Sequence, residues 1–310
     1  MPLLKISNIK VPIKELDKPL IDLIQKQFPF EIKPGHGLKL LKKSLDARKK
    51  TDIFYLMTVE INLSDSEIKK IESSQPKWQM NKSKPDEKQF QLILEKGLGN
   101  SNKLKPLIIG MGPAGIFAAL TFVKNGIAPI IFEQGKKVEE RYKDIQKIFK
   151  HGELIENSNI QNGEGGAGTF SDGKLYSRVK SDLRETVLQT LVHFGANPEI
   201  LYESHPHIGT DKLRNILINI RKYLENHGAQ IFYDTQIQKI KPTDKYVEVT
   251  DQNQKCYSGD VLVLSPGHSS RQLFQNLNGV VQIESKPFAV GFRIEFSQSL
   301  VNQEIGRAHV

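Results

Sequence analysis

The fold is decided by the stretch Leu107-Ile108-Ile109-Gly110-Met111-Gly112-Pro113-Ala114-Gly115. Its three apolar residues are long enough for a buried parallel strand, and a Gly-x-Gly-x-x-Gly pattern follows at once. A helix rich in small residues then runs to Gly126, where glycine favours the left-handed conformation that ends helices. A second apolar strand over 128–132 ends in Glu133. This order of elements is typical of a dinucleotide-binding unit.

Each position in this unit has a mechanical role. Gly110 permits the tight turn out of the strand, Gly112 lets the backbone approach a pyrophosphate, and Gly115 lets the helix pack closely on the sheet. The helix N-terminus at Pro113-Ala114 presents unpaired N–H groups and a partial positive charge to phosphates. Glu133 is expected to accept hydrogen bonds from ribose hydroxyls, and its charge disfavours a 2′-phosphate. The site therefore predicts FAD or NAD; a helix-entry turn of another α/β fold is the alternative.

The composition is that of an ordinary globular protein of 310 residues, with 38% hydrophobic and 25% charged residues. No apolar run reaches the roughly 18–20 residues that span a bilayer, and the N-terminus has no signal-peptide pattern, so a cytoplasmic location is expected. Cys256 is the only cysteine, which excludes intrachain disulfides, cysteine metal cages and CxxC centres. Redox chemistry would have to come from a bound cofactor, and no metal site is expected.

The basic charge lies in the N-terminal third. Residues 1–105 hold 21 Lys and Arg against 13 Asp and Glu, whereas the rest of the chain is nearly balanced. Residues 1–75 predict a small basic α/β module with a strand at 3–13, a helix at 18–28, a strand at 54–61 and a short helix capped by Ser64. Such a surface fits either a solvated lysine-rich face or contact with nucleic acid or an acidic partner.

The remaining boundaries follow from composition and hydrophobic pattern. Residues 76–103 are expected to be a polar, proline-containing linker, and 104–284 an incomplete dinucleotide-binding domain with a parallel sheet. In this domain we expect a helix from Thr210 closed by Gly228, and strands at 230–233, 246–250 and 260–264, the last one buried. Residues 285–303 would begin a substrate-binding layer. Residues 304–310 do not resemble protein sequence, so a C-terminally truncated fragment with a non-native tail is expected.

A second glycine-rich segment spans Asn162-Gly163-Glu164-Gly165-Gly166-Ala167-Gly168-Thr169-Phe170-Ser171-Asp172-Gly173-Lys174-Leu175. Five glycines in eleven residues expose backbone that fits against a planar or anionic ligand. The end of the segment matches part of a P-loop, but Leu175 replaces the Ser or Thr that binds Mg²⁺, and no apolar strand precedes it. Nucleoside triphosphate hydrolysis is therefore excluded, and a mobile surface loop is the alternative interpretation.

Taken together, the two glycine segments resemble those of a bacterial family of FAD-dependent dehydrogenases with no established substrate. Further matches to this family lie at 207–213, 265–271 and 42–50, and the resemblance covers essentially 1–303. It implies a glutathione-reductase-like FAD-binding domain, of Rossmann type, preceded by a small α/β module. By this resemblance the 163–175 segment borders the isoalloxazine and the pyrophosphate.

The resemblance also implies cofactor contacts after the first glycine loop, in the second glycine segment, at Ile237 and in 265–271. The expected contacts in the second glycine segment are Gly165, Gly166, Gly168, Thr169, Asp172 and Lys174. The backbone of Ile237 is expected against the adenine. Ser265 and Gly267 occupy the place of an Ala-Thr-Gly segment in many FAD proteins, with Pro266 as a departure. Lys174 would stabilise a reduced flavin anion.

No residue is identified as a catalytic acid or base from the sequence. The pair in His205-Pro206-His207 lacks neighbouring carboxylate or cysteine ligands, which disfavours a metal site. His268 and Arg271 follow a strand end and are candidates to hold an anionic substrate. Arg141 is predicted either to reach the pyrophosphate or to form a surface ion pair.

The sequence thus predicts an FAD-dependent oxidoreductase that acts on a small organic substrate, with a further electron donor or acceptor as partner. Hydride chemistry would be carried by the flavin. Two alternatives stay open: a dehydrogenase that binds NAD at Gly110–Gly115, and a flavin-containing binding or regulatory protein whose basic module contacts nucleic acid or an acidic partner. No aromatic stacking pattern or recognition helix favours nucleic acid, and no membrane contact is expected.

Overall fold

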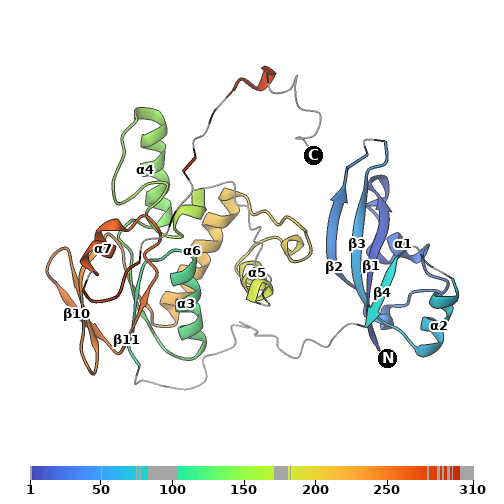
Figure 1. Cartoon of the computed structure of the whole chain (residues 1–310), viewed down its shortest axis with the longest axis horizontal. Coiled ribbons are helices and arrows are strands. Elements are labelled where there is room, and N and C mark those ends of the chain that lie inside the picture. The colour runs from blue at the N-terminus through green and yellow to red at the C-terminus, as the bar shows by residue number, and fades with distance from the viewer. Residues whose placement is uncertain are drawn as a thin grey trace.

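The computed structural model describes residues 2–49, 51–74, 76, 78–82, 104–170, 181, 183–277, 279–284, 287, 290, 291, 294 and 296–300. Two regions carry the regular structure (Figure 1). We call residues 2–82 the N-terminal module and residues 104–277 the α/β domain. In the described part of the chain, none of the helices is both long enough and apolar enough to cross a membrane.

The N-terminal module is a four-stranded antiparallel sheet with two α-helices in βαββαβ order. The strands follow the spatial order β2-β3-β1-β4. Their bounds are β1 Leu3–Pro12, β2 Lys39–Asp46, β3 Phe54–Asn62 and β4 Gln79–Lys82, and the helices are α1 Leu20–Gln25 and α2 Asp65–Ser73. Alternate apolar residues of β1 and β3 form a separate core with the helices, because strand side chains point to opposite faces in turn.

Three details of this module differ from the sequence expectation. The boundary placed at residue 75 lies too early, because β4 pairs with β1 and Trp78 packs in the module core. Strand β2 was not expected, since its lysines and serine hide the alternation. The helix expected over 18–28 is shorter, at Leu20–Gln25. Ser64 caps α2 as predicted, in a reciprocal capping box with Glu67.

The α/β domain confirms the predicted α/β fold with a parallel sheet. Strands β5, β6, β7 and β11 pair in parallel in the order β11-β5-β6-β7. These strands are Pro106–Ile109, Ile130–Phe132, Gln230–Phe232 and Val261–Leu264. The α-helices are α3 Pro113–Lys124, α4 Val138–His151, α5 Leu183–His193, α6 Thr210–Asn226 and α7 Arg271–Asn276. A three-stranded antiparallel sheet is added by β8 Ile237–Pro242, β9 Val247–Asp251 and β10 Cys256–Gly259.

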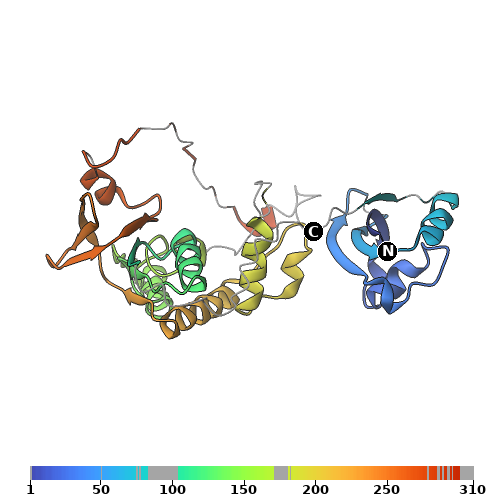
Figure 2. The ribbon, with the colours of Figure 1, turned by 90° about the horizontal axis from the view of Figure 1, so that it is seen from below.

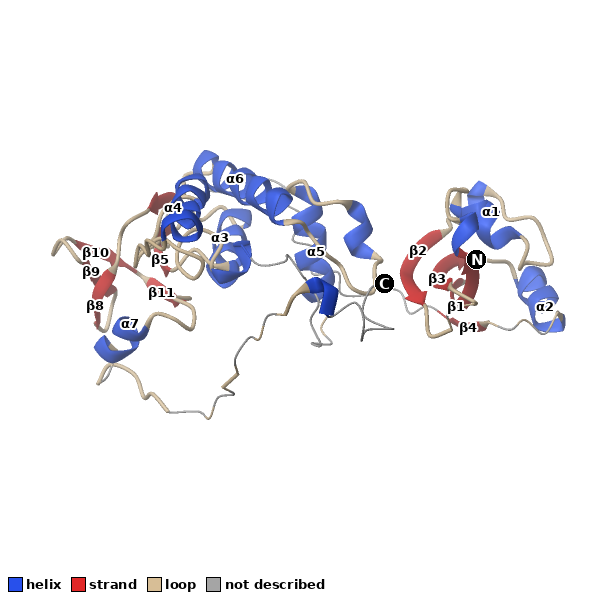
Figure 3. Cartoon of the chain, turned by 90° about the horizontal axis from the view of Figure 1, so that it is seen from above, coloured by secondary structure: helices blue, strands red, loops and turns tan. Residues whose placement is uncertain are grey.

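The domain has three layers, which the alternation of side chains along β5 explains. Ile108 packs with helices α3, α5 and α6 on one face of the parallel sheet. Leu107 and Ile109 pack on the opposite face with residues of β8 and β9. Figures 2 and 3 show helices α3 and α6 on one side of the parallel strands and β8–β10, with α7, on the other. The carboxyl ends of β5 and β6 are thereby left open between the layers.

Smaller expectations in this domain had mixed outcomes. Helix α6 begins at Thr210, and its N-cap is Gly209. With Thr210 itself as the N-cap, the helix would begin one residue later. Gly228 follows that helix with φ +87°, as predicted. Strand β11 is not buried: it lies at the edge of the described sheet, and Leu264 is 40% exposed. The layer expected at 285–303 lies mostly outside the described residues, and the tail at 304–310 lies wholly outside them.

The two regions touch through backbone atoms. The Lys43 N–H of β2 donates to the carbonyl of Tyr202 at 2.7 Å, and the Ser204 N–H donates to the carbonyl of Lys43 at 3.1 Å. Residues 202–204 therefore extend the module's sheet past its edge strand, which covers polar groups that an edge strand otherwise leaves exposed.

The layering predicts at which residues shortening a side chain destabilises the domain most. Ile131 in β6 is fully buried, so Ile131→Ala should lower the free energy of unfolding by roughly 2–5 kcal/mol through lost contacts and a cavity. Leu264→Ala, on the exposed edge strand of the same sheet, should cost much less. Urea denaturation of both variants measures this difference. Equal losses would contradict the burial pattern.

Candidate functional site

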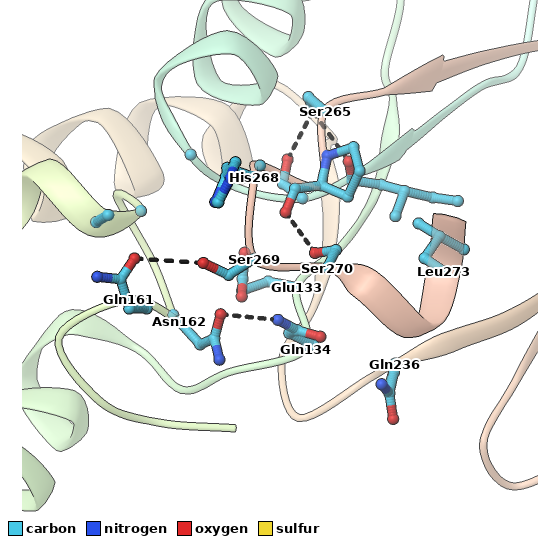
Figure 4. A pocket seen from close by; sticks show the side chains of 18 of the residues that line it. Glu133, Gln134, Gln161, Asn162, Gln236, Ser265, His268, Ser269, Ser270 and Leu273 are labelled. Carbon is cyan, nitrogen blue, oxygen red and sulfur yellow. Dashed lines mark hydrogen bonds between the residues drawn. The ribbon is translucent and has the colours of Figure 1, made fainter. Parts of the chain in front are cut away.

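A cavity of about 520 Å³ opens at the carboxyl ends of β5 and β6 (Figure 4). Five segments line it: the first glycine loop at 109–114, the end of β6 at 132–134, residues 157–168, residues 235–237 and residues 265–273. The carboxyl ends of parallel strands are where α/β folds bind ligands, because the loops of neighbouring strands diverge there. The volume lies in the usual range for small-molecule pockets, about 300–1,000 Å³.

The three glycines of the first loop have different structural reasons. A Cβ at Gly110, which has φ +96°, would lie 2.3 Å from the carbonyl oxygen of Ser265. A Cβ at Gly115 would lie 1.9 Å from the carbonyl oxygen of Gly110. Both positions therefore need glycine for packing. A Cβ at Gly112 would have its nearest neighbour 3.8 Å away, at the Gly166 Cα, so the protein alone tolerates a methyl group there.

Gly112 is also the N-cap of α3, and Pro113 and Ala114 line the cavity beside it. The first-turn N–H groups of a helix have no acceptor within the helix, and the helix dipole adds a partial positive charge at this end. A bare backbone that faces a cavity at a helix N-terminus is an arrangement that accepts an anion.

Glu133 follows β6 and is 5% exposed. Its carboxylate accepts hydrogen bonds from the Met111 N–H at 2.8 Å and from the Gly135 N–H at 2.9 Å. The sequence did not reveal this role, in which Glu133 holds the first glycine loop in place. A carboxylate has about four lone-pair sites, so two hydrogen bonds leave acceptor capacity on the cavity side. Its contact with a ribose stays a prediction.

The second glycine segment packs directly on the first. The Gly165 N–H donates to the carbonyl of Met111 at 2.8 Å, and a Cβ on Gly166 would lie 3.2 Å from the Gly112 Cα. Gly163, Gly165 and Gly166 all have positive φ. The described part, to residue 170, is thus a packed wall and not the surface loop of the alternative interpretation.

Within this wall the predicted residues divide in two. Gly166 and Gly168 line the cavity. Gly165 and Thr169 pack beneath it, with Thr169 buried and its hydroxyl 3.4 Å from the Glu164 carbonyl oxygen. Asp172 and Lys174 lie outside the described residues.

The surface ion pair considered for Arg141 is wrong, and a contact of Arg141 with a pyrophosphate stays a prediction. The side chain is fully buried, so it forms no surface ion pair, and it is not among the described residues that line the cavity. Its guanidinium donates to the carbonyl oxygens of Asn159 at 2.7 Å, Ile160 at 2.8 Å and Glu164 at 2.8 Å. Burial lowers its pKa to about 10. Arg141 therefore shapes the chain over 159–164, which forms one cavity wall.

The remaining predicted residues lie on the opposite wall. Ile237, Ser265 and Gly267 line the cavity, and so do His268 and Arg271. The Ser265 hydroxyl donates to the carbonyl of Ile109 at 2.9 Å, which fixes this wall to the end of β5. The pair His205 and His207 is not among the lining residues, and the described residues contain no cluster of three or more metal-ligating side chains.

Sequence reasoning missed the neutral polar side chains of the cavity. They are Gln134, Asn157, Gln161, Asn162, Thr235, Gln236, Ser269, Ser270 and Gln272. The Gln134 amide donates to Asn162 at 3.0 Å, and Ser269 contacts Gln161 at 3.4 Å across the cavity (Figure 4). The position of Gln134, directly after the acid at the strand end, was a signal that could have identified one of them.

Comparisons with known proteins give one family and one long relative. The domain of unknown function DUF8436 matches residues 3–62, within the N-terminal module. An uncharacterised protein of Clostridium beijerinckii is 36% identical over 99% of this chain. The chain covers 57% of that relative's length.

Similar solved structures cover about half of the chain. The thioredoxin reductase of Streptococcus pyogenes is 18% identical over 52% of this chain and 34% of its own, with a TM-score of 0.30. The thioredoxin reductase of Lactococcus lactis is 14% identical over 53% of this chain and 36% of its own, with a TM-score of 0.31. A cyclohexanone monooxygenase mutant of Rhodococcus, bound to NADP⁺, is 13% identical over 53% of this chain and 26% of its own, with a TM-score of 0.33. At these TM-scores the likeness does not establish a shared cofactor or activity.

One buried acid near the cavity predicts a pH dependence of stability. Burial raises the pKa of Glu164 to about 7, above its ordinary value in an unfolded chain. Ionisation of this residue therefore costs the folded state stability as the pH rises from the unfolded to the folded pKa. Relative to Glu164→Gln, the wild type should lose up to roughly 3 kcal/mol between about pH 4.5 and 7.

Urea denaturation of the wild type and Glu164→Gln at several pH values within this window tests the sign and size of the effect. A difference in unfolding free energy that does not change with pH would contradict a raised pKa at Glu164.

Proposed function

We propose that this chain is the FAD-binding part of a flavin-dependent oxidoreductase that acts on a small organic substrate. The observation that carries the proposal is the position of Gly112: it lines the cavity at the start of α3, and packing does not require it to be glycine. A close approach of the backbone to a diphosphate gives such a position its reason to lack a side chain.

The cavity offers suitable groups for the other parts of an ADP moiety. Glu133 supplies an acceptor for ribose hydroxyls at the end of β6. Gln134, Asn162 and Gln236 supply neutral amides that both donate and accept. His268 and Arg271 supply basic side chains on the opposite wall, suited to an anionic substrate. These residues fit FAD and NAD alike.

The choice of FAD over NAD rests on the resemblance of 163–175, 207–213 and 265–271 to FAD-dependent dehydrogenases. Bound FAD would supply the hydride-transfer chemistry, for which the single cysteine of this chain offers no substitute. The protein's own part is to hold the diphosphate, orient the ribose and exclude water from the cavity. An organic substrate and a second electron partner belong to the same proposal. They concern a protein as long as the relative from Clostridium beijerinckii, of which this chain covers 57%.

The proposal is tested by cofactor content and by one matched pair of variants. The gently purified chain should carry FAD, seen as flavin absorbance and by mass spectrometry, or should take up added FAD in preference to NAD. Gly112→Ala should fold normally but weaken FAD binding by about tenfold or more, because the new methyl group occupies the approach of the diphosphate.

Gly209→Ala is the matched control. Gly209 is the N-cap of α6, as Gly112 is of α3, an added Cβ there would meet no atom within 4 Å, and Gly209 is not among the residues that line the cavity. Its variant should bind FAD like the wild type. A colourless protein that takes up no added FAD overturns the proposal, and preferential uptake of NAD would replace it with the dehydrogenase alternative.

A further inference from the structure

Glu164 is a fully buried carboxylate that the proposed cofactor contacts do not use. One of its oxygens accepts hydrogen bonds from the Val138 N–H at 2.7 Å and from the Arg221 guanidinium at 2.8 Å. The other accepts from the Tyr233 hydroxyl at 3.0 Å. Three elements therefore meet at this carboxylate: the start of α4, the inner face of α6 and the end of β7.

The same network reaches the first glycine loop. The Tyr233 hydroxyl also lies 3.2 Å from the Met111 sulfur, and Met111 is the residue between Gly110 and Gly112. The Met111 carbonyl accepts from the Gly165 N–H, next to Glu164 in the chain. Both the side chain and the backbone of Met111 are thus held by residues attached to Glu164.

Charged groups approach Glu164 from each neighbouring element. Arg221 on α6 pairs with it and also with Glu139 on α4, whose side chain is 46% exposed. Arg141 on α4 binds the Glu164 backbone carbonyl. Lys137, just before α4, lies over the Tyr233 ring with its nitrogen 5.6 Å from the centroid. The carboxylate is buried but has donors on both oxygens.

Burying such a group is costly, and well-packed apolar residues often stabilise a protein as much or more. A buried polar network does fix one arrangement of the groups that it joins, because leaving any of them unpaired is expensive. In this chain the groups joined are the two glycine segments that form the cavity wall.

We infer that Glu164, through Tyr233, is a positioning residue that holds the two glycine segments against each other and thereby sets how tightly the cavity binds its dinucleotide. This inference rests on the proposed function for the identity of the ligand. The ordering of the first glycine loop by Glu164 and Tyr233 does not depend on which ligand binds.

The first measurement needs no cofactor. Hydrogen exchange of backbone amides in 110–115 is compared in the FAD-free wild type, Tyr233→Phe and Glu164→Ala. Both variants should exchange faster in this loop, because Tyr233→Phe removes the hydroxyl that contacts the Met111 sulfur and Glu164→Ala removes the carboxylate that holds this hydroxyl. Tyr223→Phe, the same change on α6 beside Phe194 and His227, is the control and should leave the loop unchanged. Unchanged exchange in both test variants overturns the inference.

The second measurement is the dissociation constant for FAD. Tyr233→Phe should weaken binding roughly three- to tenfold, as expected for one lost hydrogen bond. Glu164→Gln, which keeps an acceptor oxygen, should lie between the wild type and Glu164→Ala. Thermal melting of each variant confirms that the measured protein is folded. If Glu164→Ala does not fold, Tyr233→Phe and Glu164→Gln decide the result.

The two proposals fail in different ways. If the wild type binds no FAD, the proposed function fails, and hydrogen exchange alone decides the role of Glu164. If the wild type binds FAD and the folded test variants bind it equally well, the proposed function stands and the role of Glu164 in binding is overturned.

Discussion

The close approach of two glycine segments is the constraint on which the rest of the site depends. Gly112 and Gly166 face each other with no side chain between them, and the Gly165–Met111 hydrogen bond fixes their separation. The parallel sheet places the first segment at a helix N-terminus, where an anion is favoured. The second segment closes one side of the same cavity. Without the second glycine segment packed on it, the first glycine loop would be an ordinary turn at the start of a helix.

Four buried charged side chains maintain this approach, and they act on the backbone more than on any ligand. Glu133 holds the Met111 N–H, and Arg141 holds the carbonyls before the second segment. Glu164 and Arg221 join helices α4 and α6 to the second glycine segment. Glycine-rich chain has high conformational freedom, so hydrogen bonds from fixed side chains are needed to order it. Hydrogen bonds to all four side chains offset part of the cost of burying them.

The sequence was informative where structure is local. The strand, glycine loop, helix and terminal acid follow one another within 30 residues or so, and their pattern alone predicted the parallel fold and most of one cavity wall. It was uninformative where distant segments meet. Arg141 lies on a helix whose polar sequence gives no sign that this position is buried. Strand β2 is masked by lysines, and the cavity amides come together only through the tertiary fold.

The central claim is that the bare backbone at Gly112 and Gly166 holds a diphosphate. A crystal structure of the chain soaked or co-purified with FAD tests this most directly. The account predicts diphosphate oxygens within hydrogen-bonding distance of the first-turn N–H groups of α3, with the ribose hydroxyls on Glu133. A diphosphate bound elsewhere, with Gly112 still facing empty solvent, would contradict it.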